Sequence, residues 1–575
     1  MKKKVLLAIM VAVTFIVSSC GNSSRNNNAL NSVKDTNDYE VASNSIISEE
    51  STQGKTNEKK EENDNDGATE NIAYDKIDEL EVSQNIVNEN MANVNCSNEK
   101  NKAVVNYISQ NSEEYGIFEE NGIKGVSTEP LSTFSIDVDT ASYSNMRRFL
   151  MDGLLPPKDS IRIEELVNYF TYDYNEPYGD KPVEIYGEIG ECPWNSNRYL
   201  AKIGLKAKEI HIEETKENNL VFLIDVSGSM EDEDKLPLLK NAFKMLVKNL
   251  REEDRVSIVV YAGASGVALM PTSGANKERI IEVLDKLYAG GSTAGGEGIE
   301  LAYSMAKNNF IENGNNRVIL ATDGDFNVGM SSEIELENLI EEKRKEGIFL
   351  SVLGFGEGNI KDSKMEILAD KGNGNYAYID SIMEAKKVLV NEMGATLYTV
   401  AKDVKLQVEF NPSKVKGYRL VGYDNRRLNN EDFNDDTKDA GEMGAGHTVT
   451  AFYEIIPYDS EEEVPGVDSL KYQKNVSNES NEWLNVKLRY KHPEKSSSEL
   501  ITRAIGEGEL KYNNSTDFNF ASAVVELGLI LKDSEYKGKS SVDDIINRAR
   551  KGKGIDVNGY RAEFIKLAEL VKELR

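Results

Sequence analysis

The sequence predicts an α/β fold over residues 219–400: a doubly wound, mostly parallel sheet, inserted beside a β-sandwich-like domain. One observation is a set of apolar runs without polar alternation, LVFLIDV, RVSIVVYAG, NRVILATD and IFLSVLGFG, which is typical of parallel strands buried on both faces. Another is that amphipathic helical patterns such as KLPLLKNAFKMLVKNL separate these runs. Strands that alternate with helices in this way indicate a doubly wound sheet.

The segments on both sides of this domain have a period of two. VEIYGEIG and LAKIGLKA precede it, and VKLQVEF and WLNVKLRYK follow it. Such alternation predicts strands with one buried face, as in an antiparallel sandwich. We therefore expect the α/β domain to be an insertion between two parts of one sandwich. The predicted regions are an N-terminal α+β flank (104–218), a β-rich region (401–496) and a C-terminal helical region (497–575).

The N-terminus has the pattern of a secretory signal. MKKK is a basic start, VLLAIMVAVTFIV is apolar but too short to span a membrane as a helix, and SSC follows. The stretch that ends at Cys20 resembles a bacterial lipobox, which implies a lipoprotein signal peptide (1–20) and acyl chains on Cys20. The alternative is a plain cleaved signal. Residues 21–103 are polar and predict a disordered linker. We expect a lipid-anchored protein of the cell membrane or outer membrane, facing outside the cytoplasm.

Charge and cysteine content narrow the possible partners. A formal net charge of −30 over 575 residues repels nucleic acid, so we expect no DNA or RNA partner. GFGEGN lacks the spacing of a dinucleotide loop, so no nucleotide is expected.

Cys96 and Cys192 would lie in a compartment that permits disulfides. They form a possible disulfide, and the alternative is two unrelated thiols.

Polar clusters fall where the predicted strands end or a helix begins. DVSGSM follows the first strand, GGSTAGG precedes a helix, and ATDGDFNVG includes the end of a later strand. Ligands of doubly wound sheets bind beyond the carboxyl ends of the strands. The oxygen donors offered there are Asp225, Ser227, Ser229, Thr293 and Asp323. Without histidine or thiolate, this set suits Mg²⁺, Mn²⁺ or Ca²⁺.

The DxSxS motif, the glycine-rich threonine loop and the strand-end TDG together resemble the von Willebrand factor type A domain with its metal-ion-dependent adhesion site. Neighbouring stretches such as GECPWN resemble bacterial envelope proteins that carry this domain. The resemblance implies that Ser227 and Ser229 ligate a cation, most readily Mg²⁺, and that Thr293 does so in the partner-bound state. It implies that Asp225 and Asp323 act through bound water. A carboxylate from a protein partner would fill the open coordination position.

These patterns favour a non-enzymatic lipoprotein that binds a protein partner through a divalent cation. One rival is a structural or assembly component of the envelope whose contacts need no metal. A metal-dependent hydrolase is disfavoured, because no clear general base adjoins the predicted site. The stretch from Asp323 to Asn327 imitates an EF-hand loop, but Val328 and Ile334 stand where glycine and glutamate are required.

Overall fold

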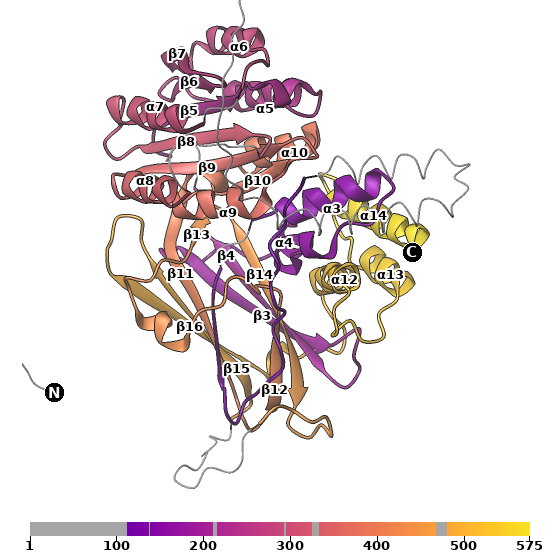
Figure 1. Cartoon of the computed structure of the whole chain (residues 1–575). Helices are drawn as coiled ribbons and strands as arrows, with labels where there is room; N and C mark the ends of the chain where they lie inside the picture. Colours follow the sequence, from indigo (N-terminus) through magenta and orange to yellow (C-terminus); the bar gives the residue numbers. More distant parts are fainter. Residues whose placement is uncertain (1–111, 137–138, 211–214, 293–294, 325–332, 467–479) are drawn as a thin grey trace, which may run out of the picture. The chain divides into compact units, whose positions relative to one another are not determined.

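The structure is a computed structural model, and the residues it describes belong to one compact unit (Figure 1). The described residues are 112–136, 139–210, 215–292, 295–324, 333–466 and 480–575. The predicted signal peptide and the predicted linker therefore lie outside the described residues. Within the described part of the chain, no helix is both long and apolar enough to cross a bilayer.

The α/β domain contains a six-stranded sheet with the order β10-β9-β8-β5-β6-β7. All neighbouring strands are parallel except β7, which is antiparallel to β6. The strands are β5 (Asn218–Asp225), β6 (Arg255–Tyr261), β7 (Ser265–Ser273), β8 (Asn315–Thr322), β9 (Ile348–Phe355) and β10 (Tyr376–Ile379). This is the predicted doubly wound, mostly parallel sheet.

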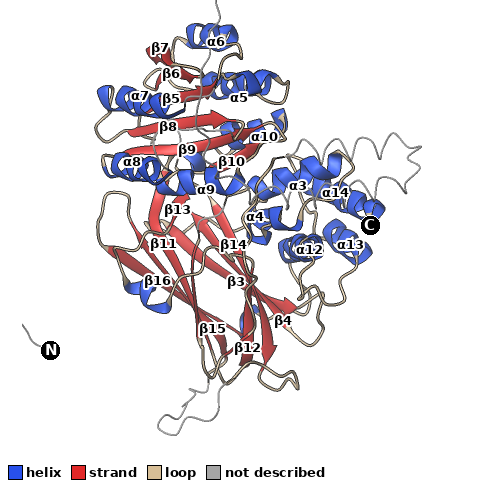
Figure 2. Ribbon diagram, in the orientation of Figure 1, coloured by secondary structure: helices blue, strands red, loops and turns tan. Residues whose placement is uncertain are grey.

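Helices cover both faces of this sheet (Figure 2). They are α5 (Leu236–Lys248), α6 (Lys277–Lys286), α7 (Gly295–Asn308), α8 (Glu333–Lys345), α9 (Asp362–Lys371) and α10 (Ile382–Lys386). A π-helix (Lys387–Asn391) and α11 (Met393–Leu397) then lead into the sandwich. Phe222 of β5 belongs to the core under α5, whereas Leu223 belongs to the core under α7. Alternate residues of one strand are thus buried on opposite faces, which explains the uninterrupted apolar runs.

Two further sheets form the sandwich that was predicted from period-two patterns. One has the order β1-β12-β14-β4-β3; in the other, β13-β11-β15-β16, strand β2 also pairs with β11. The bounds are β1 (Lys124–Gly125), β2 (Leu131–Ser135), β3 (Val183–Glu191), β4 (Tyr199–Ala207), β11 (Thr399–Phe410), β12 (Val415–Val421), β13 (Gly441–Gly444), β14 (Thr448–Pro457), β15 (Glu482–Lys491) and β16 (Ser498–Gly506). Side chains from both sheets, among them Ile203 and Leu406, share one core.

The chain connectivity makes the α/β domain an insertion. Strand β4, which precedes the domain, pairs in antiparallel fashion with β14, which follows it. The register places Ile203 opposite Ala451. The inserted domain separates the two parts of the sandwich in the sequence, but they are hydrogen-bonded to each other in the fold, as predicted.

The C-terminal helices pack against helices from the N-terminal flank. The set is α3 (Ala141–Met151), α4 (Ile163–Asn168), α12 (Thr516–Leu531), α13 (Val542–Lys551) and α14 (Tyr560–Leu574). Short 3₁₀ helices occur at Lys158–Ser160, Gly228–Glu231, Asn430–Asn434 and Glu507–Glu509. Phe170, Phe520 and Phe564 contact one another edge to face in the shared core. A helical region was predicted for 497–575, but the strand β16 occupies its first residues, Ser498–Gly506, and the helices begin later, because β16 completes the sheet beside β15. The packing of these helices on α3 and α4 was not predicted.

A buried arginine joins these helices to the α/β domain. Arg147 of α3 donates to both oxygens of Asp380 at 2.5 and 2.7 Å and to Glu384 Oε2 at 2.7 Å. Asp380 follows β10, and Glu384 lies in α10. Arg147 also donates to Tyr169 at 2.9 Å and to Glu563 of α14 at 3.0 Å. One side chain thus contacts carboxylates from both parts of the fold.

Candidate metal centre

The predicted site residues lie at one edge of the six-stranded sheet. Asp225 is the last residue of β5, and Asp323 directly follows β8. The two strands are adjacent and parallel, with Ile224 level with Ala321. The structure therefore places both aspartates at the carboxyl edge, where ligands of doubly wound sheets bind.

Asp225 is buried and fixed by local hydrogen bonds. Its exposed fraction is 0%. The amide of Ser227 donates to Oδ1 at 2.8 Å, and the hydroxyl of Thr322 donates to Oδ2 at 3.4 Å. Burial raises the pKa of Asp225 to about 6, and the nearby charge of Asp323 acts in the same direction. A cation at this edge would relieve the cost of keeping this carboxylate ionised.

The loop that follows β5 brings two hydroxyls together. Ser227 and Ser229 stand on either side of Gly228, and their Oγ atoms lie 3.1 Å apart. Two ligands on adjacent corners of an octahedron with bonds of about 2.1 Å are about 3.0 Å apart. The serine pair therefore fits adjacent positions around one Mg²⁺-sized ion.

The glycine-rich segment before α7 is hydrogen-bonded to the loop that follows β5. Gly228 N donates to Gly291 O at 3.0 Å, and Gly290 N donates to Val226 O at 2.8 Å. Gly291 has a φ of +87°, which a side chain would disfavour. Thr293 follows this anchored segment, but it lies outside the described residues, so its role as a ligand stays a prediction.

Asp323 is also fully buried, and it has a partner that the sequence reasoning missed. Lys235 Nζ lies 3.2 Å from Asp323 Oδ2 and 3.4 Å from Asn359 Oδ1. Lys235 directly precedes α5 and belongs to none of the motifs found in the sequence. The next residue, Gly324, has a φ of +110°, and a Cβ there would come within 2.6 Å of Asn359 O. Gly324 thereby lies close against the segment that joins β9 to α9.

This donor set fits a hard divalent cation. Two carboxylates and two hydroxyls supply only oxygen, the donor type that Mg²⁺, Mn²⁺ and Ca²⁺ prefer. Among the residues that the structure describes, no group of three or more His, Cys, Asp or Glu side chains could hold a metal. A site here would therefore depend on the serine hydroxyls as well as the aspartates.

The predicted cysteine sites are only partly described. Cys192 is a buried, free cysteine, and burial raises the pKa of its thiol. Cys96 and Cys20 lie outside the described residues, so the disulfide and the lipidation stay predictions.

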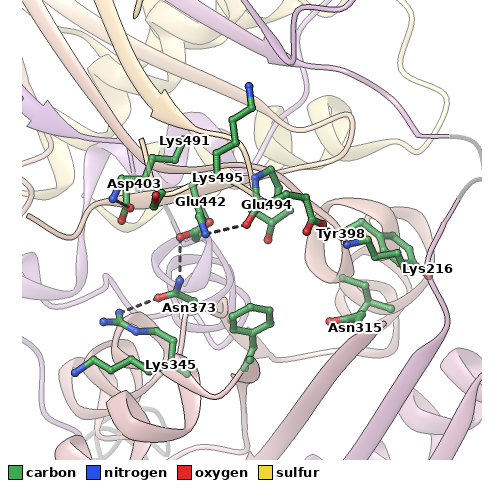
Figure 3. A pocket seen from close by; sticks show the side chains of 18 of the residues that line it. Lys216, Asn315, Lys345, Asn373, Tyr398, Asp403, Glu442, Lys491, Glu494 and Lys495 are labelled. Carbon is green, nitrogen blue, oxygen red and sulfur yellow. Dashed lines mark hydrogen bonds and ion pairs between the residues drawn. The ribbon is translucent and has the colours of Figure 1, made fainter. Parts of the chain in front are cut away.

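A separate cavity of about 820 Å³ lies at the opposite end of the parallel strands (Figure 3). Asn315 at the start of β8 and Phe349 at the start of β9 line it. Its charged side chains largely satisfy one another: Lys491 pairs with Asp403 at 2.6 Å, and Lys216 pairs with Glu494 at 2.5 Å. Sequence reasoning did not find this cavity, because sandwich and α/β residues that are distant in sequence form it together.

Comparison with known proteins identifies the family. The chain is 44% identical over 469 residues to "Uncharacterized protein YfbK" of Escherichia coli (strain K12), which covers 79% of this chain and 80% of that protein. The chain belongs to the YfbK family. Three family models match this chain. The model described as "Uncharacterized protein YfbK, C-terminal" matches residues 395–574, the von Willebrand factor model matches residues 109–202, and the von Willebrand factor type A domain model matches residues 219–391. The type A domain predicted from the three motifs is confirmed.

Other relatives of this YfbK-family chain are more distant. A 167-residue segment is 28% identical to "Uncharacterized protein sll0103" of Synechocystis, over 29% of this chain and 39% of that protein. A solved structure of a von Willebrand factor type A protein from Catenulispora acidiphila is 17% identical and covers 70% of this chain and 91% of that one, with a TM-score of 0.37. Type A domains are generally non-enzymatic interaction modules and commonly bind a divalent metal.

Proposed function

We propose that this YfbK-family chain is a lipid-anchored protein of the cell envelope that binds a protein partner through a divalent cation. The cation would be Mg²⁺ most readily, and the partner would supply a carboxylate. The observation that carries the proposal is the meeting of Ser227, Ser229, Asp225 and Asp323 at the carboxyl edge of a parallel sheet.

The chemistry of these residues supports binding rather than catalysis. Ser227 and Ser229 would hold the ion directly through neutral hydroxyls, while the two aspartates would hold it through water. Few direct anionic ligands leave the ion strongly attracted to a further carboxylate, and a bound ion would supply that electrostatic link. Within the described residues, the segments that adjoin the site contain no histidine that could act as a general base.

The membrane part of the proposal depends on Cys20. Its position after a basic start and an apolar run supports cleavage and acylation there. Several acyl chains, each contributing about 0.8 kcal/mol per buried CH₂, would give a durable anchor. The folded unit would then lie outside the cytoplasm, on the cell membrane or the outer membrane.

Metal-dependent capture tests the proposal. Purified protein is immobilised and exposed to envelope extract with Mg²⁺ or with a chelator, and wild type is compared with Asp225→Ala and Ser227→Ala. We expect one or more proteins to bind wild type only with Mg²⁺ and to be lost in both variants. Ser304→Ala, an exposed serine on α7, is the matched control and should behave as wild type. Capture that survives the chelator and both variants would favour the metal-independent assembly role instead.

A further inference from the structure

Lys235 is held at the candidate metal centre by packing as well as by charge. Its side chain is only 7% exposed, although lysine usually extends into solvent. A Cβ on Gly356 would lie 2.3 Å from Lys235 Cγ and 2.4 Å from Lys235 Cε, so the aliphatic stem fills the space beside this glycine. Gly356 has a φ of +75°, which glycine adopts without strain. The ammonium group is thereby directed at Asp323 and Asn359.

This lysine supplies positive charge to Asp323, one of the two carboxylates that would hold the cation. Asp225 and Asp323 both have an exposed fraction of 0%, and buried carboxylates are costly without a compensating charge. The ammonium of Lys235, 3.2 Å from Asp323 Oδ2, partly offsets that cost. The acidic residues 231–233 nearby are exposed, so solvent and salt screen them.

The net charge at the centre predicts how the lysine affects metal binding. The two aspartates together with Lys235 carry one net negative charge, so a divalent ion would leave one surplus positive charge. That surplus opposes binding of the ion alone. A single carboxylate from a partner would neutralise it. Without the lysine, the two aspartates would balance the ion by themselves.

We propose that Lys235 is a built-in counter-cation that weakens binding of the metal alone and makes the metal and the carboxylate of an acidic partner bind cooperatively. This inference rests on the proposed function and deepens it. Because coupling between two ligands is reciprocal, the ion favours the carboxylate as much as the carboxylate favours the ion. The centre would then be loaded mainly when an acidic partner is present.

Manganese titration tests the lysine directly. Free Mn²⁺ is measured by electron paramagnetic resonance in the presence of wild-type protein or Lys235→Met, with and without acetate as a minimal carboxylate. We expect Lys235→Met to bind Mn²⁺ alone about tenfold more tightly or better, because a repulsive unit charge is removed. Acetate should tighten Mn²⁺ binding clearly in wild type and much less in Lys235→Met.

Two further variants keep the test decisive. Lys286→Met removes an exposed lysine of α6 and should leave Mn²⁺ binding unchanged, which controls for the loss of one positive charge from the protein. Lys235→Gln keeps a hydrogen-bond donor without the charge, so it replaces Lys235→Met if circular dichroism shows that the latter is unfolded.

The outcomes separate this inference from the proposed function. Mn²⁺ binding that is equal or weaker in the charge-removed variant, or an acetate effect that is the same in both proteins, overturns the role of Lys235 and leaves the metal centre standing. Absence of Mn²⁺ binding in wild type and variants alike overturns both.

Discussion

Replacing Arg147 with methionine should cost a large part of the stability of the folded unit. The arginine side chain is 7% exposed, and its partners Asp380 and Glu384 are 7% and 0% exposed. Methionine retains much of the volume but leaves two buried carboxylates without this cation. Removing one partner of a buried ion pair typically costs about 3–5 kcal/mol. We therefore expect the free energy of unfolding to fall by roughly that amount.

Urea unfolding at neutral pH, followed by circular dichroism, measures this loss. The matched control is Arg279→Met, the same substitution in an exposed pair in which Arg279 is 57% exposed and Glu282 is 50% exposed. Solvent screens that pair, so we expect little measurable change there. The loss for Arg147→Met should become smaller at acid pH, because burial raises the pKa of Asp380 and protonation removes its uncompensated charge. Equal unfolding midpoints for the two variants would refute the assignment of Arg147 as the cation that joins the helices to the α/β domain.

Other substitutions test separate features. Gly374→Ala should destabilise the protein by about 2 kcal/mol or more, because its Cβ would lie 1.8 Å from Leu350 O; Gly266→Ala, with nothing within 4 Å, is the control in thermal melts. Mg²⁺ or Mn²⁺ should raise the melting temperature of wild type but not of Asp225→Ala, and equal melting of wild type in chelator and in metal would contradict the metal centre. The same metal effect should diminish as the pH falls through about 6, because Asp225 becomes protonated there. Its pKa is raised in the folded state, so protonation stabilises the metal-free fold. This stabilisation is fully present below the ordinary pKa of 3.8 and is lost as the pH rises through about 6. Labelled fatty acid should be incorporated into wild type and absent from Cys20→Ser, and label retained by that variant would exclude the lipobox.

The sequence predicted those features that depend on short stretches of chain. The apolar runs identified β5, β6, β8 and β9, and period-two alternation identified β3, β4, β11 and β15. Strand β7 was not anticipated, because Ser265–Ser273 is only partly buried at the edge of the sheet and mixes polar with apolar residues.

At the candidate site, the motifs located residues but not their surroundings. Asp225 and Asp323 could be placed because the first ends a recognisable strand and the second directly follows one. Lys235 could not be placed, because its role depends on Gly356 and Asn359, which are distant in sequence. The packing of α12 and α14 on α3 and α4 was missed for the same reason: it arises from contacts between the two ends of the folded unit.

The pairing of β4 with β14 sets an order for biosynthesis. β4 is complete long before its partner has been made, since the whole inserted domain is translated between them. The sheet of the inserted domain uses only strands from Asn218 to Ile379, so it can close while the sandwich still waits for its second half. Non-local strand pairing is slow, and unpaired strand edges invite aggregation. We therefore expect the nascent chain to pass through a stage in which β4 has an open edge, the stage at which a chaperone would be most needed.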